Sequence, residues 1–179
     1  GHACFALDAL KTAVANLADL IDRQMAQICN PDMSNGLPAN LVGRTGSDRA
    51  AHHGFKAMQI SSSALTAEAL KLTMPASVFS RSTECHNQDK VSMGTIAARD
   101  CLRILELTET VAAIVTLALC QAVDLRKAEN CHRRSLAMHA AVRARVPMVD
   151  ADRRQDHDIA TVLALHRSGA LPIGEVDWR

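Results

Sequence analysis

The sequence predicts an all-α fold, a long antiparallel helix bundle, and three observations support this. Apolar residues recur in steps of three and four over several long stretches, as on the buried face of a helix. Proline and glycine gather between these stretches. In the loop from Pro75 to Asn87, the only strand-like residues, Val78 and Phe79, are too few for a sheet. A length of 179 residues suits one domain, or a piece of one, with a real core.

The first expected helix covers residues 1–29. The residues expected to face the core are apolar and follow the helical period: Leu7, Leu10, Val14, Leu17, Ile21 and Ile28. Asn30-Pro31 ends this helix, because a residue before proline disfavours the helical conformation. Residues 31–47 hold too many prolines and glycines for a regular element, so we expect a loop with turns.

The second expected helix begins at Asp48 and ends at Met74-Pro75. Its expected core-facing residues are Phe55, Met58, Ser62, Leu65, Ala69 and Leu72. Small side chains at residues 61–63 let another helix approach closely. Residues 75–87 are expected to form a loop.

The third expected helix, residues 91–125, carries a coiled-coil-like pattern. Its members are Ala97, Cys101, Ile104, Thr108, Val111, Val115, Ala118, Ala122 and Leu125. Two shorter helices are expected near residues 131–145 and 156–168. We therefore divide the chain into a central helical-bundle segment, 1–126, and a C-terminal short-helix segment, 127–179. Three long helices usually need a fourth partner, so association with other chains is expected.

Composition excludes several classes of partner. The net charge is +1, from 20 basic and 19 acidic residues, and the chain has no Tyr, so we expect no nucleic-acid binding. The apolar run 111–120 is about half of what crosses a bilayer, so no membrane span is expected. The start of the chain has no basic segment followed by an apolar core and a cleavage site, so we expect no signal peptide, and the six cysteines form no C-x-x-C pair. We expect a soluble, cytoplasmic protein with free thiols, buried where they fall in helical patterns.

Metal binding is not expected. His52 and His53 are adjacent, and adjacent residues on a helix point about 100° apart, so they cannot chelate one ion from one face. The C-terminal histidines lack cysteines or carboxylates at ligand spacing.

The polar stretch at residues 82–89 lies before the third helix and is the place where function is expected. Glu84, Asn87 and Gln88 lead into an apolar helix, where buried polar groups need partners or a ligand. A helix N-terminus also favours carboxylates, because unpaired N–H groups and the positive end of the dipole lie there. The alternative is a loop that only caps the helix.

Residues 84–94, E-C-H-N-Q-D-K-V-S-M-G, resemble a motif of the aromatic amino-acid ammonia-lyase and aminomutase family, E-x-H-N-Q-D before a long core helix. Three further runs resemble family motifs in the same order. They are S-N-G-L-P-A-N-L at 34–41, H-G-F-K at 53–56 and C-Q-A-V-D-L-R at 120–126. The resemblance extends over nearly the whole chain.

The resemblance implies that this chain is the C-terminal part of an ammonia-lyase-like helical core. Family members are about three times longer and use a methylidene-imidazolone electrophile (MIO) made from an Ala-Ser-Gly tripeptide. This chain contains no Ala-Ser-Gly and no tyrosine to act as the family's base. The chain alone is therefore expected to be inactive. A homotetramer, with active sites built from three subunits, or association with an N-terminal fragment is implied.

Five positions match residues to which the family gives roles. Glu84 matches a glutamate near the substrate amino group, and Gln88 a residue beside the electrophile; these are the expected catalytic residues. Asn87 matches the hydrogen-bonding neighbour of Gln88, and Ile60 an apolar position against the substrate ring, which Ala64 joins one turn later. These three are expected to bind substrate. The alternatives are interface packing for Asn87 and Gln88, and ordinary helix core for Ile60.

The implied reaction is elimination or 2,3-migration of the α-amino group of an aromatic amino acid. Histidine lyases carry glutamate where this chain has Gln88, so phenylalanine or tyrosine is favoured over histidine. The small Ala64 leans toward phenylalanine. Lyase and aminomutase both remain open. The alternative from a different class is a non-catalytic helical oligomerisation module.

Overall fold

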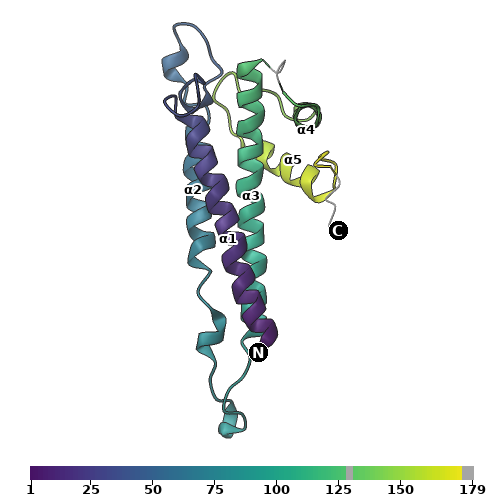
Figure 1. Cartoon of the computed structure of the whole chain (residues 1–179). Helices are drawn as coiled ribbons and strands as arrows, with labels where there is room; N and C mark the ends of the chain where they lie inside the picture. The colour runs from purple at the N-terminus through teal and green to yellow at the C-terminus, as the bar shows by residue number, and fades with distance from the viewer. Residues whose placement is uncertain (128–130, 175–179) are drawn as a thin grey trace. The chain divides into compact units, whose positions relative to one another are not determined.

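The computed structural model describes residues 1–127 and 131–174, and the regular elements there are helical (Figure 1). The α-helices are α1 (His2–Cys29), α2 (Lys56–Lys71), α3 (Gly94–Arg126), α4 (Arg133–Arg143) and α5 (Asp156–Arg167). No strand occurs in the described residues. The predicted all-α class is confirmed.

The helices contribute to two compact units. The first contains residues 1–22 and 62–112, and the second contains residues 23–61 together with the chain from residue 113 onward. α1, α2 and α3 each supply a segment to both units. The division of the chain at residue 126 stays a prediction.

In the first unit, segments of three helices surround a small apolar core. One cluster joins Val14 and Ala15 of α1 to Ala69 of α2 and to Ile104 and Leu107 of α3. A second cluster joins Cys4, Ala76 and Ala97. The second cluster brings together the beginning of α1, the chain just after α2 and the beginning of α3, so α2 runs antiparallel to the other two helices, as predicted.

The prediction for the buried face of α1 is wrong at two of its six residues: Val14 is buried and Leu7, Ile21 and Ile28 are half-buried, but Leu10 and Leu17 are not. Leu10 and Leu17 are 45% and 55% exposed. Apart from Val14, the buried residues alternate in steps of four and three along a neighbouring face: Cys4, Asp8, Lys11, Ala15, Ala18, Asp22, Met25 and Cys29. Three members of that face are charged, and an apolar periodicity does not detect them. They are tolerated because other groups bond them: Ser62 of α2, for example, donates a 2.8 Å hydrogen bond to Asp22.

α2 begins eight residues later than Asp48, its predicted start. Gly54 has φ +54°, a left-handed conformation that ends any helix, and a Cβ there would lie 2.6 Å from the Asn40 carbonyl oxygen. The backbone N–H groups of His53 and Gly54 donate to the Asp152 carboxylate, at 2.8 and 2.9 Å. A distant carboxylate therefore caps the approach to α2. The predicted core-facing residues of α2 and α3 are buried or half-buried, as expected.

The second unit is held by polar side chains of α3. Gln121 is fully buried; its amide donates to the carbonyls of Leu41 and Val149, at 3.1 and 2.8 Å, and accepts from the Val149 N–H at 3.0 Å. The Asp124 carboxylate contacts His139 and Arg143 at 2.6 and 2.7 Å. Within the run at 120–126, Gln121 thus connects α3 to two loops of this unit, and Asp124 connects α3 to α4.

Four free cysteines, Cys4, Cys29, Cys101 and Cys120, are buried, as predicted from their helical patterns, and Cys85 is exposed. Among the described helices, none combines the length and apolar character needed to cross a membrane.

Candidate functional site

The candidate site lies in the loop that joins α2 to α3, and this loop reaches beyond the first turn of α1 (Figure 1). Pro75 follows α2 with extended backbone, and two 3-10 helices follow, η3 (Ala76–Phe79) and η4 (Glu84–His86). All of it belongs to the first unit.

Two hydroxyl side chains close the loop on itself. The Ser80 hydroxyl donates to the Val91 carbonyl at 2.6 Å and accepts from the Val91 N–H at 3.1 Å. Nearer the tip, the Thr83 N–H donates to the Gln88 carbonyl, and the Gln88 N–H donates to the Thr83 hydroxyl, both at 3.0 Å. These pairs fix the chain on both sides of residues 84–87.

The tip has an unusual backbone. Cys85 and His86 adopt left-handed φ values of 50° and 57° without being glycine. Such a conformation costs about 1–3 kcal/mol for each residue and persists only where surrounding bonds enforce it. Here the Asn87 N–H donates to the Glu84 carbonyl at 3.0 Å. The Ser82 hydroxyl is hydrogen-bonded to Nδ1 of His86 at 2.8 Å. The turn is therefore held in one shape.

The structure places the three polar candidates, Glu84, Asn87 and Gln88, within this one turn. All three are exposed in the chain. Among the described residues, none of their side chains is hydrogen-bonded to the protein. One carboxylate and two amides are thus available to accept and donate hydrogen bonds.

The two apolar candidates lie elsewhere, on α2. Ile60 is 64% exposed and Ala64 is also exposed, so neither is part of this chain's core. Four residues apart on one helix, they share a face. Ala64 belongs to the same unit as the loop, whereas Ile60 belongs to the second unit.

The base of the loop is attached to α1. The Asp8 carboxylate accepts the N–H groups of Ala76 at 2.9 Å and Ser77 at 3.1 Å. The Lys11 ammonium lies 3.0 Å from Asp8 and donates to the Met74 carbonyl at 2.7 Å. Burial alone raises the pKa of Asp8, but the bonds from the two amides and from Lys11 outweigh it and hold that pKa well below its usual value.

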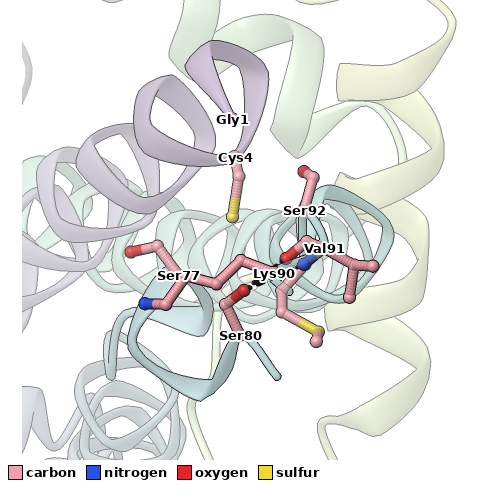
Figure 2. A pocket seen from close by; sticks show the side chains of 8 residues that line it. Gly1, Cys4, Ser77, Ser80, Lys90, Val91 and Ser92 are labelled. Atoms are coloured by element: carbon pink, nitrogen blue, oxygen red, sulfur yellow. Dashed lines mark hydrogen bonds between the residues drawn. The ribbon is translucent and has the colours of Figure 1, made fainter. Parts of the chain in front are cut away.

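A hollow of about 340 Å³ lies at the loop base, not at its tip. Figure 2 shows Cys4 pointing from α1 toward the loop residues Ser77, Ser80 and Val91. None of the five candidate residues lines this hollow. Within the described part of the chain, no group of three or more histidine, cysteine or carboxylate side chains is arranged to hold a metal ion.

Sequence reasoning missed the residues that shape the loop. It assigns no role to Ser80, and it treats Thr83 only as part of the polar stretch. It also passes over Asp8 and Lys11, although their signal was present: both fall on one three-and-four repeat of α1 with Cys4 and Ala15. No sequence signal pairs Ser80 with Val91.

Comparisons with known proteins agree on one family. A family model described as aromatic amino acid lyase matches residues 1–144. The chain is 40% identical to a histidine ammonia-lyase of Koribacter versatilis, over 93% of this chain and 32% of that protein. It is 38% identical to a tyrosine ammonia-lyase of Cupriavidus metallidurans, over 93% of this chain and 31% of that protein.

A solved structure leads to the same family. The tyrosine aminomutase of Streptomyces globisporus superimposes with a TM-score of 0.89 at 33% identity, over 98% of this chain and 34% of that one. The chain spans about a third of the length of the curated relatives it matches. Several other similar relatives are histidine ammonia-lyases.

Proposed function

The chain belongs to the aromatic amino acid lyase family, and from that premise we propose that it is the segment of an ammonia-lyase or 2,3-aminomutase that presents Glu84, Asn87 and Gln88 to an aromatic amino acid. The observation that carries the proposal is the closed turn at residues 83–88. It exposes one carboxylate and two amides from a single fixed backbone.

The roles follow from ordinary chemistry. A substrate amino acid carries an ammonium group, and a nearby carboxylate such as Glu84 attracts that group and accepts hydrogen bonds from it. The Asn87 and Gln88 amides both donate and accept, so they fix the orientation of polar groups around the reacting carbon. Ile60 and Ala64 offer apolar surface to the substrate ring.

The methylidene-imidazolone group supplies the electrophile in this chemistry. The Ala-Ser-Gly tripeptide that forms it does not occur in these 179 residues, so another part of the protein has to provide it. The amide side chains of Asn87 and Gln88 suit the hydrogen bonding that such a polar group needs. This chain by itself is accordingly proposed to be inactive.

For the substrate, we favour phenylalanine or tyrosine over histidine. The support is the neutral amide of Gln88, which provides no carboxylate for an imidazole N–H or imidazolium. The relatives include both histidine and tyrosine lyases at nearly equal identity, so overall similarity does not separate the two substrates.

The test uses the complete protein that carries this segment. Turnover of phenylalanine, tyrosine and histidine is compared, with analysis of both the unsaturated acid and the β-amino acid. We expect phenylalanine or tyrosine to react fastest, and β-amino acid would identify an aminomutase. Fastest turnover of histidine would overturn the substrate assignment, and no turnover of any of the three would overturn the function.

Variants test the roles of the residues. Glu84→Gln is expected to lower kcat/KM about 100-fold, because it removes the charge while keeping the shape. The matched control is Glu106→Gln on α3, which is 61% exposed and bonds only weakly to Arg103 at 3.4 Å. Equal effects of the two changes on kcat/KM would show that Glu84 has no specific role in the site.

A second candidate function has its own support in exposed apolar side chains. Phe5, Leu17 and Leu102 are 73%, 55% and 62% exposed, more than a lone helical unit normally leaves uncovered. They favour an oligomerisation module, and a homotetramer in the complete enzyme. Glu84→Ala and Gln88→Ala separate the candidates: loss of native mass without loss of activity per assembled molecule favours the module, and the reverse favours catalysis.

A further inference from the structure

We propose that Asp8 and Lys11 of α1 are positioning residues that clamp the loop carrying Glu84, Asn87 and Gln88. The roles of those three residues rest on the proposed function, whereas the clamp itself rests on contacts within the first unit. Neither Asp8 nor Lys11 lies in the turn, so they act through the backbone of the loop.

The clamp grips the loop immediately after α2. The two carboxylate oxygens of Asp8 accept N–H groups from consecutive residues, Ala76 and Ser77. Two adjacent bonds to one rigid carboxylate fix the direction of the chain as well as its position. Lys11 holds the residue before Pro75 through the Met74 carbonyl. The start of the loop is thus attached at three of four consecutive residues, Met74, Ala76 and Ser77.

Lys11 also ties this attachment to α3. Its side chain is 0% exposed, and its ammonium lies 3.0 Å from Asp8 and 3.4 Å from Asp100. A buried ammonium needs such partners, because leaving it unpaired is strongly unfavourable. The pair on α1 therefore connects the chain after α2 to α3.

The path from clamp to turn is short. Three residues after Ser77, the Ser80 hydroxyl bonds both backbone groups of Val91, which closes the loop. Three residues further, the Thr83 hydroxyl accepts the Gln88 N–H and the Thr83 N–H donates to the Gln88 carbonyl, which closes the turn. A shift at residues 76–77 is consequently passed along a closed frame to the Glu84 side chain.

The experiment measures loop motion by hydrogen–deuterium exchange in the complete protein, below the unfolding temperature of every variant. We expect Asp8→Asn to speed exchange in peptides covering residues 75–93 at least tenfold and to leave the middle of α3 unchanged. Asp19→Asn, on the same helix but outside the clamp, is the matched control and should change neither. Unchanged exchange at 75–93 in Asp8→Asn would overturn the clamp.

A double variant separates positioning from plain stability. Asp8→Asn with Lys11→Met removes both charges of the buried pair and leaves only the half-buried Asp100 carboxylate without its Lys11 contact, so the thermal midpoint should recover toward that of the wild type. We expect exchange at 75–93 to stay fast and kcat to stay at least tenfold low, with KM changed less. Recovery of kcat together with the midpoint would show a structural role only and overturn the positioning.

A different result would overturn the proposed function. If the wild-type protein turns over none of the aromatic amino acids, the proposed function is wrong, and the hydrogen–deuterium exchange result alone then decides whether Asp8 and Lys11 clamp the loop.

Discussion

The two units of the chain solve the same problem, attaching loops to helices, with different chemistry. In the first unit a buried ion pair, Asp8 and Lys11, holds the loop after α2. In the second a neutral side chain, Gln121, holds two loops through the backbone of Leu41 and Val149. Both anchors are buried, and both bond backbone groups far away in the sequence.

The difference lies in how each anchor responds to change. When the Gln121 amide is removed, the backbone groups that it leaves unpaired are neutral. The hydrogen bonds of an amide also do not depend on pH. An ion pair that loses one member leaves a buried charge, and it also depends on protonation. The loop with the candidate catalytic residues is thus attached by the more sensitive of the two devices.

Lys11→Met should give the largest effect. It leaves the Asp8 carboxylate buried without its cation, and breaking a buried pair on one side costs about 3–5 kcal/mol. Chemical unfolding of the complete protein measures this loss. A loss below about 1 kcal/mol would mean that the two amides of the loop satisfy Asp8 without Lys11.

Gln121→Leu should cost less, about 2–3 kcal/mol, because it leaves two carbonyls and one N–H buried without their partners. Exchange should quicken near residues 41 and 149 and stay unchanged at 75–93. Gln121→Glu, similar in shape, is the control: it keeps the acceptor for Val149 and loses both donors.

Low pH should weaken the contribution of Asp8 to stability and leave that of Gln121 unchanged. The folded pKa of Asp8 is held below its unfolded value of about 3.9, so its contribution to stability is complete above that pH and is lost as the pH falls toward the folded pKa. The stability difference between wild type and Asp8→Asn should therefore shrink below about pH 4. The difference for Gln121→Leu should stay constant over the same range, as unfolding curves at pH 7, 5 and 3 would reveal.

Ser80→Ala should have the smallest effect on stability, about 1 kcal/mol, because it removes one hydroxyl that bonds a half-buried segment. Its effect on the turn should be larger than on the fold. Faster exchange confined to residues 80–91, with a thermal midpoint close to wild type, is the expected result; Thr95→Ala, which removes an exposed hydroxyl outside this closure, serves as control.

The sequence predicted the fold well where burial is apolar. The α3 pattern from Ala97 to Leu125 is buried or half-buried throughout, because no charged residue interrupts its period and its one hydroxyl, on Thr108, bonds within the helix to the Ile104 carbonyl. On α1 the same reasoning chose Leu10 and Leu17, which are exposed, since the buried face includes Asp8, Lys11 and Asp22. Apolar periodicity cannot identify a face whose polar members are bonded to distant residues.

For the candidate site, the sequence indicates which residues to consider but not the contacts that hold them. The polar stretch before α3 and its motif point to Glu84, Asn87 and Gln88, and the structure places them on one turn. The left-handed Cys85 and His86 and the two hydroxyl closures depend on tertiary geometry, which no local propensity encodes. The roles of all five candidate residues stay predictions.

The capping of α2 by Asp152 has a consequence for how the protein is made. The bonds from His53 join residues 99 positions apart. At about 5–20 residues per second, a ribosome needs roughly 5–20 s to synthesise the partner after His53 has been added. During that interval the approach to α2 has no cap, and the apolar surface around it depends on other protection from aggregation. Nascent chains stopped before Asp152 should therefore expose residues 53–58 to proteases that spare the finished protein.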